Sequence, residues 1–549
     1  VVVSGYDLQG FWTRLQGSRL YQELQAVQGV RDALAPLEES RREIREEICL
    51  DVDESTMMSL FGRKFDIGFY GELPGDRADL VLVAELADED AAETLLEQCE
   101  AQLTTEKGAT FSETEVGGRS VRVASNSEGE EVLFYSLEDE RLALGTTRER
   151  LEQTLAIGGD EGIASMTSVQ GYTAALRKLP AATVVVYVDQ AALRQAAEAV
   201  TADTAGAAAA GADRMAAART ALGAYPMADA VVFGMHWEDS GIGGTMYTRF
   251  PSGERPELAR MLTAAPGEVR SLAYQPEGTL LYGALNTLDA RVVYDEVYRY
   301  AVEATRVQLG VAGTPDSARA DSVVAAGLAR TEAELGVDVE DDLVGWVGKE
   351  VALAIIGVDK TGFFPVPQVG LTIATTDAAR TRQVMGTLET SVSEMALARA
   401  SIPLQWQSVE HEGQTIRYAP TPMGEGLSLA WTVADQFLLL ASSRGVVQRM
   451  IDSRAGRAPA LPANPEFSAM TGFYPQQANA IGFVNIERIL TEVEGLMTTY
   501  GQMSGNVGVA DSASTGRRVI SALKNAPRLG FYSEADGDGV FGHFMLEVR

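Results

Sequence analysis

Cysteine and histidine are both scarce in this sequence. Two cysteines, Cys49 and Cys99, occur in 549 residues. That number excludes a scaffold held together by several disulfides and a zinc site built from four thiolates, although one disulfide between the two remains open. The three histidines, His236, His411 and His543, fall in separate predicted elements. We therefore expect neither a histidine-rich metal site nor a bound cofactor.

Basic residues and long apolar runs are also few. The chain has 45 lysines and arginines against 77 acidic residues, so its formal net charge is −32. Nucleic acid and anionic lipid surfaces both require a basic footprint that neutralises phosphates, which argues against unaided binding to either. No apolar run approaches the roughly 20 residues that a membrane-spanning helix needs. The remaining composition, 46% apolar and 22% charged, is that of a globular protein.

The first residues lie inside a predicted strand. The chain opens with Val1-Val2-Val3 and not with methionine. We therefore expect a further segment to precede it in the natural protein. A signal peptide, a lipoprotein anchor or a membrane helix would each place the rest of the chain outside the cytoplasm. We accordingly predict an extracytoplasmic protein that contacts the membrane through a segment absent from this chain.

Similar blocks recur in the same order along the two halves of the chain. Each pair shares its glycine or small-residue positions, its basic residues and its alternating apolar residues. The matched blocks are residues 62–71 with 348–357, 118–124 with 413–419, and 144–148 with 440–444. Because the order is preserved over most of both halves, the sequence predicts a tandem duplication.

The predicted fold class is α+β, with a mostly antiparallel sheet and packed helices in each half. Glycine-containing turns separate residues 233–237 from 246–248, and 529–532 from 543–545. Such spacing favours hairpins over helical crossovers. The predicted organisation has three parts, which are a first repeat at 1–250, a junction at 251–277 rich in proline and glycine, and a second repeat at 278–549.

Each candidate motif for catalysis or metal binding in the sequence lacks a residue or a spacing that the chemistry requires. Residues 345–350 have the wrong glycine spacing for a phosphate loop, and Glu350 stands where a magnesium-binding hydroxyl is needed. Residues 521–524 and 360–362 resemble motifs of penicillin-recognising enzymes, but their order is reversed and the middle motif is absent. The acidic stretches 51–55 and 338–342 lack the glycine and the final glutamate of a calcium loop. We therefore predict no catalytic residue, no metal site and no enzyme.

Four arginines occupy matching positions in the two halves despite the acidic background. Arg122 corresponds to Arg417, and Arg148 corresponds to Arg444. Structural arginines commonly pair with nearby carboxylates or with helix ends, and we favour that interpretation. The alternative is that they contact an anion or a partner at a pseudo-symmetric cleft.

Several packing motifs resemble the bacterial family known as domain of unknown function 3352. The resemblance rests on strands that follow a proline and end in Asp or Asn before a helix. It rests further on the segments 11–15 with Tyr21, 60–63 and 142–147. Members of that family typically follow a membrane helix or an export signal, so the resemblance implies an extracytoplasmic location. It implies no active site.

Two functions are compatible with these observations. The first is a non-enzymatic, membrane-tethered scaffold or accessory subunit that binds a protein partner at a membrane surface. The alternative is a binding module that holds a lipid or another hydrophobic ligand in a cleft between sheet and helices.

Overall fold

The computed structural model describes most of the chain. The described residues are 1–27, 30, 63–70, 79–116, 118–156, 170–179, 182–190, 228–250, 255–309, 318–360, 365–421, 425–504 and 516–549. Cys49, the acidic stretch 51–55, the segment 60–62 and the first four junction residues, 251–254, lie outside them.

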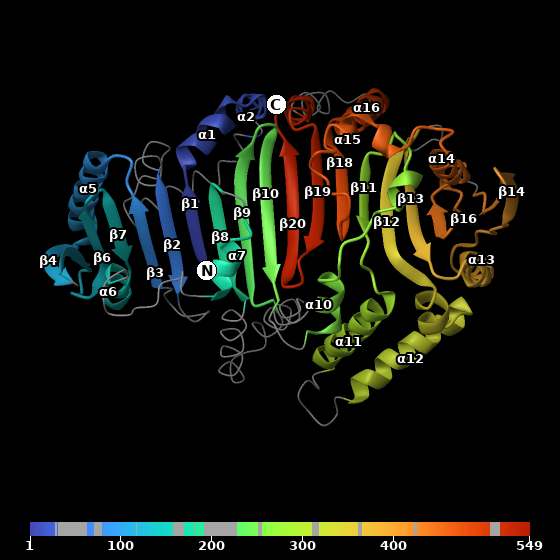
Figure 1. The fold of residues 1–549 in the computed structure, drawn as a ribbon, viewed down its shortest axis with the longest axis horizontal. Helices are drawn as coiled ribbons and strands as arrows, with labels where there is room; N and C mark the ends of the chain where they lie inside the picture. The colour runs from blue at the N-terminus through green and yellow to red at the C-terminus, as the bar shows by residue number, and fades with distance from the viewer. Residues whose placement is uncertain are drawn as a thin grey trace.

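The described elements alternate strands with helices in both halves (Figure 1). Residues up to 250 form β1 (Val2–Tyr6), α1 (Leu8–Gly17), α2 (Arg19–Gln25), β2 (Lys64–Tyr70), β3 (Asp79–Glu85), α5 (Glu89–Lys107), β4 (Thr110–Val116), β5 (Arg119–Ser125), β6 (Glu131–Glu138), β7 (Arg141–Gly145), α6 (Arg148–Leu155), α7 (Gln170–Leu176), β8 (Val184–Asp189), β9 (Ala230–Glu238) and β10 (Gly241–Arg249). The helix α10 (Glu257–Leu262) and the 3-10 turn η3 (Ser271–Tyr274) follow.

The second half contains the same succession of strands. It forms β11 (Leu281–Leu285), α11 (Ala290–Gln308), α12 (Ala318–Leu335), η5 (Val339–Val344), β12 (Val347–Asp359), β13 (Val366–Thr375), α13 (Ala378–Ala400), β14 (Gln407–His411), β15 (Gln414–Tyr418), η6 (Glu425–Leu427), β16 (Ala430–Ala434), β17 (Phe437–Ala441), α14 (Arg444–Arg454), η7 (Leu461–Ala463), α15 (Pro465–Ser468), β18 (Ala480–Asn485), α16 (Ile486–Ser504), β19 (Arg528–Ala535) and β20 (Gly539–Glu547).

All these strands form one 20-stranded sheet in which every pairing is antiparallel. From one edge to the other the order is β4-β5-β6-β7-β3-β2-β1-β8-β9-β10-β20-β19-β18-β11-β12-β13-β17-β16-β15-β14. The last strands of the two halves, β10 and β20, pair side by side at the centre (Figure 1). Outward from that pair, the strands of both halves follow the same order, each first-half strand matching the one numbered ten higher.

Helices cover both faces at each end of the sheet. In the first half, α5 places Ala92 against Phe65 and Ala84 on one face, and α6 places Leu151 against Val121 on the other. In the second half, α13 and α14 occupy the same places over β15, β16 and β17. The alternation of apolar residues along the strands causes this two-sided packing, since neighbouring side chains point to opposite faces.

Local capping fixes where the matching helices start and end. Asp88 accepts a hydrogen bond from the backbone N–H of Ala91 at the start of α5, and Asp377 caps α13 in the same way. Gly108 ends α5 in the left-handed region, at φ 65°, and Ser401 ends α13 at φ 55°. These caps satisfy backbone groups that the helices leave free.

The predicted α+β class and the antiparallel sheet are confirmed, as are both closing hairpins, β9–β10 and β19–β20. The asparagines after β11 and at the end of β18 bond differently. Asn485 accepts from the backbone N–H of Arg488, whereas Asn286 donates to the carbonyl of Glu268. Helix α11 begins at Ala290, three residues beyond the reach of Asn286, and Asp289 caps it instead by accepting from the backbone N–H groups of Arg291 and Val292. Among the described helices, none has the length and apolar character needed to cross a bilayer.

Candidate functional site

Arg122 and Arg417 lie in two matching carboxylate networks. The guanidinium of Arg122 in β5 donates two hydrogen bonds to Glu100 in α5, at 3.0 and 2.5 Å. Arg417 in β15 donates two to Glu389 in α13, at 2.9 and 2.5 Å. The residue directly across the sheet from each arginine, Tyr135 or Trp431, donates to the same carboxylate. Both arginines therefore clamp a helix onto the sheet.

Electrostatics reinforce the first of these networks. Burial by itself would raise the pKa of Glu100, but hydrogen bonds from Arg122 and Tyr135 outweigh it and hold that pKa below its ordinary value. The hydrogen bond to Glu100 also raises the pKa of Arg122. Burial, followed by the nearby carboxylate of Glu100, raises the pKa of the Tyr135 hydroxyl. At neutral pH, Glu100 and Arg122 therefore stay charged, and the Tyr135 hydroxyl stays protonated and can donate to Glu100.

Arg148 and Arg444 differ from each other. Arg148 forms an exposed ion pair with Glu131 at 3.2 Å and lies 5.8 Å from the ring of Phe134. Arg444 lies 4.9 Å from the ring of Tyr418, beside a small cavity. Arg148 starts α6, which packs on the face opposite to α5, so it does not approach Arg122. The structure does not bring the four predicted arginines together at one cleft.

The cavity beside Arg444 holds a second guanidinium. It has a volume of about 300 Å³ and is lined by Arg449, Gln368 and Asp359 in addition to Arg444. Arg449 donates to the side-chain carbonyl of Gln368 at 2.6 Å. Burial lowers the pKa of Arg449, and the carboxylate of Asp359 opposes that shift. Sequence reasoning missed Arg449, since nothing in its spacing separates it from other helical arginines.

Two of the three histidines meet at the centre of the sheet. Pairing of β10 with both β9 and β20 brings His236 and His543 to the same face. His236 contacts Glu238 at 2.9 Å, whereas His543 contacts Thr245 at 3.1 Å. Burial lowers the pKa of His543. In the part of the chain that the structure describes, no group of three or more His, Cys, Asp or Glu side chains is arranged to hold a metal ion.

Cys99 and the second acidic stretch have structural roles. Cys99 in α5 is disulfide-bonded. Cys49, the other cysteine of the chain, lies outside the described residues. Asp338 accepts from the backbone N–H of Asp341 at 2.7 Å and so caps η5.

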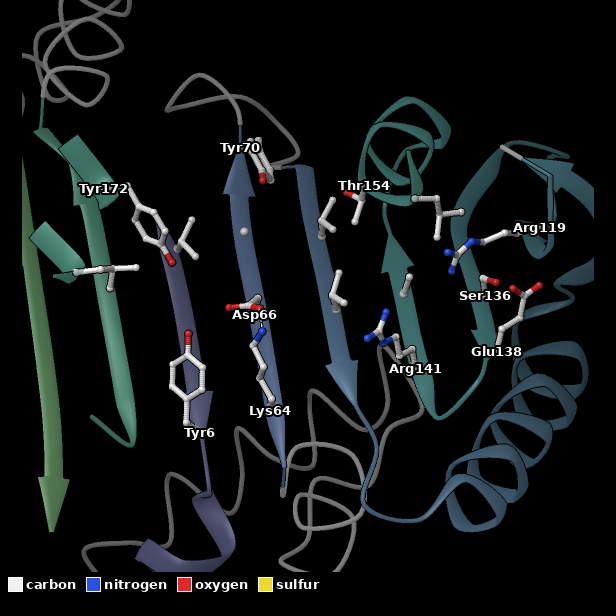
Figure 2. Close-up of a pocket in the computed structure, with 17 residues that line it drawn as sticks. Tyr6, Lys64, Asp66, Tyr70, Arg119, Ser136, Glu138, Arg141, Thr154 and Tyr172 are labelled. Carbon is white, nitrogen blue, oxygen red and sulfur yellow. Dashed lines mark ion pairs between the residues drawn. The ribbon is translucent and has the colours of Figure 1, made fainter. Parts of the chain in front are cut away.

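A large cavity forms a groove across the first half of the sheet. It has a volume of about 540 Å³ and runs over β1, β2, β3, β7 and β6, with α6 and α7 beside it (Figure 2). We call it the first-half groove. Figure 2 shows Tyr6 and Tyr172 at one side, Lys64 and Asp66 in the middle, and Arg141 toward the other side.

Charges of both signs line the first-half groove. Lys64 lies 3.8 Å from Asp66, which accepts a hydrogen bond from Ser4 at 2.5 Å. Arg119 and Arg141 are exposed and make no ion pair or hydrogen bond among the residues that the structure describes. Apolar side chains, among them Val2, Val81, Val83, Leu155 and Leu176, complete the lining. A ligand of the groove therefore needs apolar surface together with negatively charged groups that can pair with Arg119 and Arg141.

The opposite face of the central strands is apolar and partly open. Four large apolar strand residues are exposed by 39–47%, namely Phe69, Met246, Leu353 and Phe531. The pairing registers place all four on one face, together with half-exposed neighbours such as Phe233 and Phe544, which stack at 6.0 Å. We call this the apolar sheet face.

Comparison with known proteins assigns the family. The family described as "Protein of unknown function (DUF3352)" matches residues 52–411 and 331–495. The chain belongs to the DUF3352 family. The two matches together cover residues 52–495, which include β2, β3, β6 and β7 of the first-half groove and the strands β11 to β18 of the second half, and they carry no assigned activity. No curated protein matches the chain.

One solved structure is similar to part of this DUF3352 protein. It is titled "Structure of crystal form III of TP0453", with 11% sequence identity over 51% of this chain and 78% of that chain, and a TM-score of 0.21. So low a TM-score supports no inference about fold or function.

Proposed function

We propose that this DUF3352 protein is a non-enzymatic scaffold that binds a partner protein through the apolar sheet face, outside the cytoplasm and tethered to a membrane. The observation that carries the proposal is the gathering of exposed Phe69, Met246, Leu353 and Phe531 on one face. Monomeric soluble proteins rarely expose a contiguous apolar surface of this kind, and such patches typically mark sites of interaction.

The surface is built by close approach of backbones. Phe531 packs over the glycines Gly482 and Gly542 of the neighbouring strands, and Phe544 packs over Gly244. A methyl group at Gly244 would lie 2.1 Å from the ring of Phe544. Because glycine lets the rings lie flat along the sheet, the centre presents a broad aromatic area.

The location belongs to the same proposal. Cys99 is disulfide-bonded, and disulfides persist in oxidising compartments outside the cytosol. The membrane tether is supported only by the resemblance to relatives that follow a membrane helix or an export signal.

Duplication of an ancestral unit explains how the sheet became so long. The two halves share their strand order, their carboxylate networks and a side-chain contact, since Ser136 donates to the carbonyl of Ser120 as Thr432 does to that of Thr415. Joining the two units through β10 and β20 covers one edge of each, and exposed strand edges otherwise favour aggregation. The repeats at 1–250 and 278–549 are the units we propose.

Affinity purification from detergent-solubilised membranes of the natural source tests the scaffold. A variant with Met246→Ser and Phe531→Ser is compared with the natural protein by quantitative mass spectrometry. The matched control replaces two apolar residues of α11 that are even more exposed, at 61% and 50%, by Val297→Ser and Tyr300→Ser. We expect one partner whose recovery falls at least about tenfold in the sheet variant and stays unchanged in the control.

Two results would contradict the scaffold. Equal recovery of the same proteins with both variants would show that the apolar sheet face binds none of them. A lipid retained in native mass spectrometry and lost from the sheet variant, with no protein partner, would favour the hydrophobic-ligand module instead.

A further inference from the structure

The matching helices α6 and α14 each place an arginine against the sheet, but the acceptors of these arginines differ. In the first half, Arg150 in α6 forms an ion pair with Asp79 at the start of β3, at 3.4 Å. In the second half, Arg449 in α14 donates to the side-chain carbonyl of Gln368 in β13, at 2.6 Å. The strand registers match Gln368 with Asp79, so a neutral amide stands where the first half has a carboxylate.

Arg449 is therefore a cation with little compensation. Burial lowers the pKa of its guanidinium, and the attraction of Asp359 offsets that shift only in part. Removing a charge from water costs free energy unless an opposite charge pairs with it. The side chain of Arg449 nevertheless stays accessible to solvent through the cavity. An anionic group that enters the cavity can reach it and supply the missing charge.

The cavity beside Arg444, which we call the second-half cavity, offers charges of both signs. Its volume of about 300 Å³ lies at the lower end of the range typical of small-molecule sites. Arg444 and Arg449 contribute guanidinium groups, and Asp359 contributes a carboxylate. Pro420 and the ring of Tyr418 add apolar surface. A ligand that uses all of this lining carries a negative group, a positive group and a short apolar part.

The contacts already present leave capacity for such a ligand. A guanidinium has more N–H donors than the one that Arg449 gives to Gln368, and a carboxylate has several acceptor sites. Arg449 and Asp359 can therefore bind a ligand while they keep the contacts that they make within the chain.

We propose that the second-half cavity binds a free α-amino acid, with the carboxylate of the ligand against Arg449 and Arg444 and its ammonium group against Asp359. Each charge of the ligand then meets an opposite charge of the lining, whereas Asp359 would repel a simple anion. The cavity lies on the face that α14 covers, away from the apolar sheet face. The inference therefore does not depend on the proposed scaffold function.

Three ligands of nearly equal size test the charges of the site. L-leucine carries both charges, 4-methylpentanoate lacks the ammonium group, and 3-methylbutylamine lacks the carboxylate. Their binding to the complete chain of residues 1–549 is measured by isothermal titration calorimetry at constant ionic strength, since salt screens such pairs. We expect leucine to bind with a Kd of about 1 mM or below. Each analogue should bind at least about tenfold more weakly, because it leaves one charge of the lining without its partner.

Two variants separate the contributions of the lining. Gln368→Glu changes only the charge of that side chain and gives Arg449 the carboxylate that its first-half counterpart has. It should weaken the binding of leucine and of 4-methylpentanoate at least about tenfold. Asp359→Asn should remove the advantage of leucine over 4-methylpentanoate without weakening the latter. A purely structural defect would not change the preference between two ligands in this way.

Gln448→Glu is the matched control. It makes the same change on the residue before Arg449, outside the cavity lining that the structure describes. It should therefore keep the natural affinity for all three ligands. If circular dichroism shows that Gln368→Glu does not fold, Arg449→Gln takes its place with the same expected loss of leucine binding.

Four outcomes overturn the inference. These are no binding of leucine up to about 10 mM, equal affinities for the three ligands, an equal loss of affinity in Gln368→Glu and Gln448→Glu, and tighter binding of 4-methylpentanoate than of leucine. The last result would assign the cavity to a simple anion. None of them changes the recovery of partners that tests the apolar sheet face.

Discussion

The two halves of the molecule share a backbone plan but differ in what lies on one face of it. In the second half, the strands β12 and β17 present Ala352, Ala354 and Leu439 beneath η3 and α14, and all three are buried. In the first half, the matching positions carry Asp66, Gly68 and Ala143, and they border a groove. Strand pairing therefore depends little on the side chains of this face. These side chains can differ between the halves and line a groove in one of them.

The opposite face near each end shows the contrary behaviour. There the arginine, the helical carboxylate and the aromatic donor occur in both halves with nearly the same distances. Removing one partner of such a network leaves a partly buried charge without compensation. Positions that hold a helix in place are therefore less free to change than positions that line a groove.

The largest expected difference in stability is between alanine variants of Glu350 and of its counterpart in the first half, Lys64. Glu350 is 2% exposed and accepts from two backbone N–H groups. Glu350→Ala should lower the free energy of unfolding by about 4 kcal/mol, since both buried donors lose their acceptor. Lys64→Ala should change it by about 0.5 kcal/mol or less. Chemical denaturation of both variants measures the difference, and equal losses would contradict the contrast between the two halves.

The carboxylate networks should respond alike in both halves. Glu389→Ala should cost about 3 kcal/mol and Glu100→Ala about 2 kcal/mol, because the side chain of Glu389 is 10% exposed and that of Glu100 20%. The depressed pKa of Glu100 adds a pH signature. Its stabilisation is complete above the ordinary pKa of 4.5 and is lost as the pH falls through the folded-state value.

Denaturation from pH 7 to pH 3 measures that signature. The natural protein should lose more stability over this interval than Glu100→Ala. Glu131→Ala, which removes a half-exposed carboxylate paired with Arg148, is the control and should keep the natural pH dependence. Parallel curves for the natural protein and Glu100→Ala would show that the network does not depress that pKa.

His543, at the centre of the sheet, should make the stability of the protein depend on pH. His543 in β20 matches Thr245 in β10, which has no ionisable group. Because burial lowers the pKa of His543 below 6.5, the unfolded chain takes up the proton first, and stability should decline as the pH falls below about 6.5. His543→Gln should flatten this decline by at most about 1 kcal/mol in thermal melts at pH 7 and pH 5. An unchanged decline would assign it to other groups.

The smallest effect is expected at Arg148. Its ion pair with Glu131 leaves both side chains 45% exposed, so Arg148→Gln should cost about 0.5 kcal/mol or less. Arg122→Gln should cost clearly more, since Arg122 holds α5 through Glu100. Equal losses of unfolding free energy in the two variants would mean that exposure does not determine how much each arginine contributes to stability.

Much of the fold could be predicted from local sequence. Alternation along β5, the glycine turns of the two closing hairpins and the repeated blocks indicated antiparallel strands in the correct places. The pairing role favoured for arginines holds at Arg122 and Arg417. The first-half groove was not predicted, although the aligned blocks 62–71 and 348–357 already match Lys64 with Glu350. A charge reversal at one aligned position cannot be interpreted as a binding site until the structure shows which residues of the neighbouring strands lie beside it.

The sequence by itself determined the strands, their faces and the helices that clamp them, because these depend on the spacing of apolar residues and on caps a few residues away. Only the tertiary structure decided which surfaces stay open. That outcome depends on η3 contacting β12, β13 and β17, which lie far from it in sequence, and on β10 pairing with β20 nearly 300 residues later. Such contacts are set by the closure of long loops and by shape, which no local pattern records.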